Sequence, residues 1–130
     1  MSHGVVHFEI SADDPEKLGG FYKDLFGWTI QKVPMGEMDY YMVQTVKTDE
    51  KGMPQEPGIN GGLTKRMSPE QVPVNYIEVE SVDQYLAKAK QLGAKEMMGK
   101  SPVPQMGWFA LLIDPAGNQF GIWQNDPSAK

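Results

Sequence analysis

The sequence predicts an α+β domain built from two copies of a β-α-β-β-β unit. The first observation is a repeated strand pattern, in which His7-Phe8-Glu9-Ile10 is matched by Tyr76-Ile77-Glu78-Val79. The second is that each run precedes one amphipathic helical segment, a glycine that ends it, and further strand-like runs. The third is the length of 130 residues, which suits one domain with a single core.

The first unit begins with a predicted strand at residues 5–10. Asp13 and Glu16 have the spacing of a capping box at a helix start, and Gly27 is expected to end the helix. Gly19 and Gly20 lie inside this helix and cost about 1 kcal/mol each relative to alanine, so a close backbone contact there would explain them. The apolar stripe of the helix is Leu18, Phe21, Tyr22, Leu25 and Phe26, and further strands are predicted at residues 28–33, 40–47 and 59–65, with a turn at Pro34-Met35-Gly36 and a loop at residues 48–58.

The second unit follows a proline-containing linker at residues 67–73 and starts with a predicted strand at 74–80. Ser81 and Gln84 form another capping-box spacing, and Gly93 is expected to end the second helix. The tail after Asn125 is expected to fray. The remaining predicted elements are strands at 95–100, 108–113 and 119–124, a loop at 101–107, and a turn at 114–118.

Composition excludes several classes of function. The net charge of −5 disfavours nucleic acid and anionic membranes as partners, because both attract cationic surfaces. The absence of Cys excludes disulfides and thiolate chemistry and fits a reducing compartment. Neither a signal-peptide pattern nor an apolar run of membrane length is found, so we expect a cytoplasmic protein.

Two segments resemble the vicinal oxygen chelate superfamily, which includes glyoxalases, bleomycin-resistance proteins and extradiol dioxygenases. They are DPEKLGGFYKDLFGW at residues 14–28 and DPAGNQFGIWQ at residues 114–124. The similarity is to the small glyoxalase-related branch rather than to glyoxalase I. It implies one domain over residues 1–130, with modules at about 5–66 and 73–125 and helices outside a curved mixed-sheet cup. It also implies a homodimer.

The resemblance also locates the metal ligands of the superfamily's metalloenzymes, which bind a divalent ion through four side chains. The matched positions here are His7, Gly62, Val74 (or Tyr76 in the repeat register) and Gly121. Glycine has no side-chain donor, whereas such a site needs converging oxygen and nitrogen ligands. We therefore expect no cofactor, while a divalent metal held by His7 with non-standard partners stays an alternative.

Two carboxylates offer a different route to chemistry. Side chains alternate along a strand, so His7 and Glu9 should share a face, and Glu78 is the repeat mate of Glu9. If the three converged, Glu9 and Glu78 could act as an acid–base pair, because an apolar cup raises the pKa of a carboxyl group. The alternative is that both carboxylates sit in an ordinary polar network.

The predicted cup has aromatic and polar lining residues. Gly121 would leave a hollow where the metalloenzymes carry a ligand, and Trp123, on the same face, would stack on a flat or cationic ligand. The other candidate ligand-binding residues are His7, Tyr41, Asn60, Gly62, Thr64, Tyr76 and Trp108.

Three functions remain. The first is metal-independent binding of a small molecule, as in drug sequestration by bleomycin-resistance proteins. The second is a glyoxalase-like lyase or isomerase that uses Glu9 and Glu78, with or without a displaced metal. The third is an assembly or regulatory subunit whose cup has no ligand.

Overall fold

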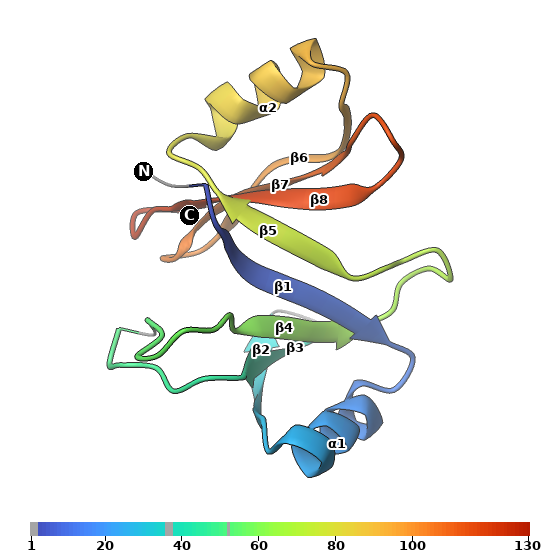
Figure 1. The fold of residues 1–130 in the computed structure, drawn as a ribbon, viewed down its shortest axis with the longest axis vertical. Coiled ribbons are helices and arrows are strands. Elements are labelled where there is room, and N and C mark those ends of the chain that lie inside the picture. The colour runs from blue at the N-terminus through green and yellow to red at the C-terminus, as the bar shows by residue number, and fades with distance from the viewer. Residues whose placement is uncertain (1–2, 36–37, 52) are drawn as a thin grey trace. The chain divides into compact units, whose positions relative to one another are not determined.

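The computed structural model describes residues 3–35, 38–51 and 53–130 and contains the predicted elements in the predicted order. The first set is β1 (Val5–Ala12), α1 (Pro15–Phe26), β2 (Thr29–Met35), β3 (Met38–Gln44) and β4 (Gly61–Lys65). The second set is β5 (Val74–Glu78), α2 (Val82–Gln91), β6 (Lys95–Val103), β7 (Gly107–Ile113) and β8 (Gln119–Asn125). The α+β class with two β-α-β-β-β modules is therefore confirmed (Figure 1).

The chain divides into two compact units that we call module one and module two. Module one is His7–Pro73, and module two joins the described residues before His7 to Val74–Lys130. In module two, the carbonyl oxygen of Gly4 accepts a hydrogen bond from the backbone N–H of Glu78 at 3.0 Å, so the N-terminal segment is tied to β5.

Module one has the strand order β2-β3-β4-β1. β1 and β4 are parallel, whereas the β2–β3 and β3–β4 pairs are antiparallel. Helix α1 packs on one face of this sheet, and the core there contains Ala12, Tyr41, Val43 and Leu63. Strand alternation places Phe8 and Ile10 on the same side, against this core.

The structure corrects the predicted start of α1. Asp14, not Asp13, is the N-cap, because its carboxylate accepts a hydrogen bond from the backbone N–H of Lys17 at 3.1 Å. Pro15 then occupies the first helical turn, where its missing N–H costs nothing. Gly27 ends the helix as predicted, with the positive φ of 73° that glycine adopts without strain.

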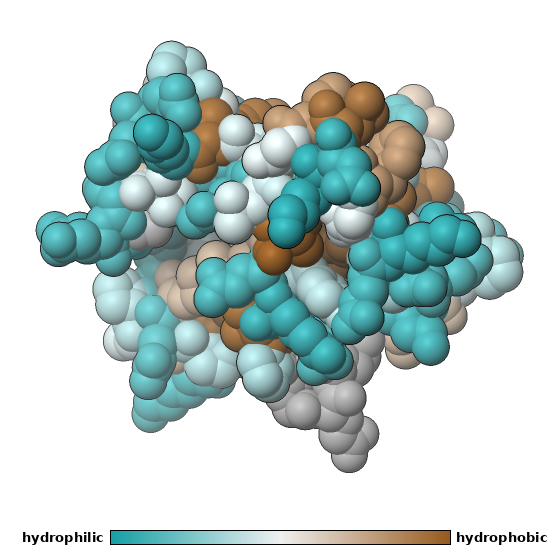
Figure 2. Space-filling model, turned by 90° about the horizontal axis from the view of Figure 1, so that it is seen from below, coloured by the Kyte–Doolittle hydropathy of each residue, from teal (hydrophilic) through white to brown (hydrophobic). Residues whose placement is uncertain are grey.

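Only part of the predicted apolar stripe of α1 is covered by its own module. Leu18 packs against the core, but Phe21, Leu25 and Phe26 are each more than half exposed, at 54%, 57% and 59%. Figure 2 views the molecule from the side on which Figure 1 draws α1, and it shows hydrophobic patches between hydrophilic residues.

The two helical glycines differ. A Cβ added at Gly19 would lie 3.3 Å from Ile30, so the predicted close contact is confirmed there. A Cβ added at Gly20 would meet no atom within 4 Å, so packing does not explain this glycine.

Module two has the strand order β5-β8-β7-β6, with β5 and β8 parallel. The other pairs are antiparallel. Helix α2 covers one face, over a core of Val79, Val82, Ala110, Leu112 and Ile122. Ser81 caps α2 as predicted, accepting a hydrogen bond from the backbone N–H of Gln84 at 3.2 Å.

Several boundaries differ from the predictions; β3, for example, ends at Gln44 rather than at residue 47. β6 continues to Val103, through Pro102, because it is the last strand in the order of its module and an edge strand tolerates proline. The tail is not frayed, because Ala129 is buried and its carbonyl accepts a hydrogen bond from Gln105 at 2.8 Å. Pro34 and Met35 belong to β2, while Gly36 of the predicted turn lies outside the described residues.

Replacing Leu63 tests the core of module one. This side chain is fully buried at 0% exposure, so Leu63→Ala should lower the free energy of unfolding by about 2–5 kcal/mol. Leu25→Ala, at an exposed leucine, should change it by less than about 1 kcal/mol. Urea denaturation followed by circular dichroism measures both, and equal losses would contradict the assigned core.

The turn between β7 and β8 predicts an acid-sensitive contribution to stability. The carboxylate of Asp114 accepts hydrogen bonds from the backbone N–H groups of Asn118 and Ala116, both at 2.9 Å. The bond from Asn118 is the main cause that lowers the pKa of Asp114. Because the folded pKa is the lower one, this stabilisation is complete above the unfolded pKa of about 3.9 and is lost as pH falls through the folded pKa.

Asp114→Ala should therefore destabilise the protein at pH 7 and do so much less at about pH 2–3. Urea unfolding at both pH values measures the difference, with the exposed Asp24→Ala as the control. A destabilisation by Asp114→Ala that is independent of pH would show that the carboxylate charge is not involved.

Candidate functional site

Three polar side chains are in contact on the face of module one opposite α1. The Tyr40 hydroxyl lies 3.2 Å from His7 Nε2 and donates a hydrogen bond to Glu9 Oε2 at 3.3 Å. His7 Nε2 and Glu9 Oε2 are 3.5 Å apart, and the two side chains are 34% and 30% exposed. We call His7, Glu9 and Tyr40 the polar triad.

Strand alternation explains how the sequence builds this triad. His7 and Glu9 are two residues apart on β1, so they share the face that Phe8 and Ile10 do not occupy. In the register, Glu9 pairs with Gly62 of β4. A Cβ at Gly62 would overlap the hydroxyl and ring of Tyr40, so the glycine makes room for this phenol.

The sequence prediction places Tyr41 in the cup wall and misses Tyr40. Tyr41 lies on the helix side, is buried in the core, and donates a hydrogen bond from its hydroxyl to Glu16 of α1 at 3.3 Å. Burial is the main cause that raises the pKa of Tyr41. The signal in the sequence was Val43, because a residue two positions from a core valine faces the core as well.

Asn60 and Thr64, both predicted to bind the ligand, have different surroundings in the structure. The side-chain oxygen of Asn60 accepts hydrogen bonds from the backbone N–H groups of Thr45 and Val46, at 2.8 and 3.1 Å, so it joins two chain segments. Thr64 is half-buried on β4, two residues after Gly62, and so shares the face of the polar triad.

Module two also places an aromatic ring over a glycine. Tyr76 pairs with Gly121 in the register, and a Cβ at Gly121 would overlap the Tyr76 ring. Phe109 contacts Tyr76 edge-on, with ring centroids 6.3 Å apart. The hollow predicted at Gly121 is therefore filled by Tyr76.

Glu78 of module two belongs to a hydrogen-bonded chain. The side-chain nitrogen of Asn125 donates to Glu78 Oε2, and the indole N–H of Trp123 donates to the side-chain oxygen of Asn125 at 2.8 Å. Trp108 lies on the opposite side, packed against the core under α2, with its indole N–H donating to Asp126 at 2.9 Å.

The predicted convergence of Glu9 and Glu78 stays a prediction. Glu9 lies in module one and Glu78 in module two, and each is held by hydrogen bonds within its own module. His7 and Glu9 do share a face, as expected from their spacing.

The residues at the four matched ligand positions do not fit the metal site of the superfamily. His7 is a suitable donor, but the places of side chains at Gly62 and Gly121 are taken by the rings of Tyr40 and Tyr76. Val74 is a buried hydrophobic residue. Among the residues that the structure describes, no group of three or more His, Cys, Asp or Glu could hold a metal ion.

Comparisons with known proteins agree with the fold. Residues 5–45 match the family described as "Bleomycin resistance protein-like N-terminal". Two proteins named "Putative glyoxylase CFP32", from Mycobacterium bovis and Mycobacterium tuberculosis, are 27% identical over 119 residues. The match covers 89% of this chain and 43% of each relative, so the chain spans less than half the length of these relatives.

Solved structures of similar fold include the hypothetical protein BH1468 from Bacillus halodurans. Its TM-score is 0.70 at 13% identity, covering 100% of this chain and 99% of that one. A Streptomyces coelicolor methylmalonyl-CoA epimerase has a TM-score of 0.68 at 14% identity, covering 95% and 99%. The epimerase from Mycobacterium tuberculosis has a TM-score of 0.69 at 10% identity, covering 95% and 89%.

The family match, the relatives and the solved structures, together with the repeated β-α-β-β-β module, all indicate the vicinal oxygen chelate superfamily. Within it, the fold is of the glyoxalase and bleomycin-resistance type. As to membranes, none of the helices in the described ranges has the length and apolar character of a membrane span.

The overlap at Gly62 yields a prediction for a double-mutant cycle. Gly62→Ala should lower the free energy of unfolding by about 1–3 kcal/mol, because the new methyl group forces the Tyr40 phenol to move. In a Tyr40→Ala background the same substitution should cost much less. Urea denaturation of the four proteins measures the coupling. Gly4→Ala, at an exposed and uncrowded glycine, is the control, and a cost at Gly62 independent of Tyr40 would contradict the packing.

Proposed function

We propose that this protein binds a small organic molecule on the polar-triad face of module one without using a metal ion. The observation that carries this proposal is at Gly62, where the Tyr40 phenol takes the place in which the superfamily's metalloenzymes are expected to have a ligand. His7 is the one expected donor that remains, and it contacts Tyr40 and Glu9. The polar triad is therefore a hydrogen-bonded group of side chains at a place where a metal ion would need several converging oxygen and nitrogen ligands.

The chemistry of the triad suits a ligand that carries hydrogen-bond donors or a positive charge. An ionised Glu9 only accepts hydrogen bonds, and its two oxygens have more acceptor positions than its contacts with Tyr40 and His7 use. The net charge of −5 also favours the approach of a cation. Amine-bearing compounds of the kind that bleomycin-resistance proteins sequester therefore fit best.

A second function, proton transfer in a glyoxalase-like lyase or isomerase, is favoured by the mutual contact of the three groups. With the Tyr40 hydroxyl 3.3 Å from Glu9 and 3.2 Å from His7, a proton taken up by the Glu9 carboxylate could pass to a neighbour. Glu9 would be the base, and Tyr40 and His7 would orient it. The printed names of similar proteins, "Putative glyoxylase CFP32" among the relatives and methylmalonyl-CoA epimerase among the solved structures, support this class.

Substitutions in the triad separate these functions from a structural role. Glu9→Gln and Tyr40→Phe keep the size of each side chain, and each should weaken binding of a cationic glycopeptide such as bleomycin at least tenfold. This is because a hydrogen bond to a charged group contributes about 1.5–3 kcal/mol. Isothermal titration calorimetry measures the affinity, with the exposed Glu50→Gln as the matched control.

Elemental analysis of protein purified without chelator tests metal independence. We expect far less than one equivalent of any transition metal, and glycopeptide binding that is unchanged by dialysis against a chelator. One equivalent of tightly held metal that disappears in His7→Ala would overturn the proposal. Turnover of a hemithioacetal that is lost in Glu9→Gln would instead establish the second function.

A further inference from the structure

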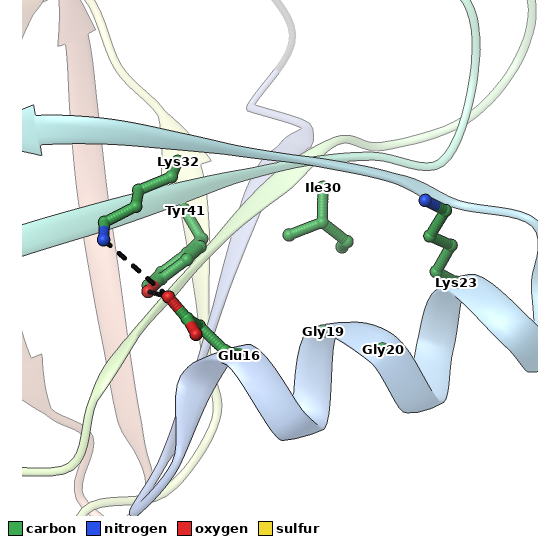
Figure 3. A pocket seen from close by; sticks show the side chains of 7 residues that line it. All are labelled: Glu16, Gly19, Gly20, Lys23, Ile30, Lys32 and Tyr41. Carbon is green, nitrogen blue, oxygen red and sulfur yellow. Dashed lines mark hydrogen bonds and ion pairs between the residues drawn. The ribbon is translucent and has the colours of Figure 1, made fainter.

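A groove lies on the helix side of module one, between α1 and strands β2 and β3. Its volume is about 240 Å³, and its lining includes Gly19, Gly20 and Lys23 of α1 with Ile30 and Lys32 of β2 (Figure 3). Because these residues lie on the opposite face from Glu9 and His7, the groove is separate from the polar triad. Nothing in the proposed function uses it.

Gly20 keeps this groove open at a cost in stability. A glycine inside a helix destabilises it by about 1 kcal/mol relative to alanine. At Gly19 the contact with Ile30 explains the choice, but at Gly20 an added Cβ would meet no atom within 4 Å. Packing therefore does not explain why residue 20 is a glycine. Without a side chain, Gly20 leaves this part of the groove empty.

The two ends of the groove differ in charge. Lys32 lies 3.2 Å from Asp39 and 3.7 Å from Glu16, so its ammonium group is neutralised, and the hydrogen bond with Asp39 is the main cause that raises its pKa. Tyr41 at this end donates its hydroxyl to Glu16. The polar groups of this end are thus occupied by one another.

Lys23 marks the other end, two helical turns along α1 from Glu16. Within the described ranges it forms no ion pair, and Figure 3 shows it at the opposite end of the groove from Glu16, with Ile30 between them. The groove therefore has the ammonium group of Lys23 at one end, next to an apolar floor formed by Ile30.

We infer that this groove binds a small organic monocarboxylate, with its carboxylate at Lys23 and its apolar body over Ile30 and the Gly19–Gly20 backbone. A volume of about 240 Å³ is below the range of about 300–1,000 Å³ that accommodates drug-sized ligands. The groove therefore has room for a ligand with one aromatic ring or a short acyl chain. Inorganic phosphate fits less well, because Lys23 alone supplies too few donors for a multiply charged anion and leaves the apolar floor uncovered.

Benzoate and its neutral amide, benzamide, are the probes that test this site. Protein-observed NMR titration of the full chain should show saturable shifts for Gly19, Gly20, Lys23 and Ile30 with benzoate. Benzamide and inorganic phosphate should bind at least tenfold more weakly.

Two variants and two controls locate the site. Gly20→Leu fills the groove and Lys23→Gln removes its cation, so each should weaken benzoate binding at least fivefold. Gly20→Leu also raises helix propensity, which keeps the protein folded. Lys17→Gln, on α1 outside the groove, should bind benzoate like the unchanged protein, and Gly20→Ala should raise the melting temperature.

Absence of saturation with benzoate, or equal binding by Gly20→Leu and the unchanged protein, would overturn this inference. Equal affinity for benzamide would show that the apolar floor alone is responsible and would overturn the role of Lys23. Because Glu9→Gln leaves the groove intact, benzoate binding by that variant separates this site from the proposed function.

Discussion

The organisation of this protein depends on the two-residue repeat of its strands, which sends alternate side chains to opposite faces of a sheet. A single helix covers one face in each module, so the hydrophobic side chains gather there around Leu63 in module one and Leu112 in module two. The other face is left to polar and aromatic groups such as Glu9 and Tyr76. The alternation of side chains along the strands therefore determines both which residues form the core and which residues form the candidate site.

A tyrosine ring over a strand glycine appears in both modules, as Tyr40 over Gly62 and Tyr76 over Gly121. A glycine at such a position weakens a strand but lets a large side chain approach the backbone closely. Each ring then occupies the volume in which a metal-ligating side chain would have to stand. The same packing thus removes donors and, at Gly62, brings a phenol hydroxyl to Glu9 and His7.

The adjacent residues Tyr40 and Tyr41 show how alternation separates two candidate sites within one module. Tyr40 joins the polar triad, and Tyr41 faces α1, where it borders the groove with Lys32 and Glu16. The two hydroxyls both donate to a glutamate, but the glutamates belong to different faces. A ligand at one site therefore has no direct contact with the other.

The sequence by itself determined the module repeat, both helices with the glycine end of α1, the Asp114 turn and the shared face of His7 and Glu9. All of these follow from periodicity or from residues close together in the chain. It did not determine Tyr40, the filled places over Gly62 and Gly121, or the ordered tail at Ala129. Only the tertiary structure decided these, because each depends on the register between strands or on a contact between distant segments, which local patterns do not encode.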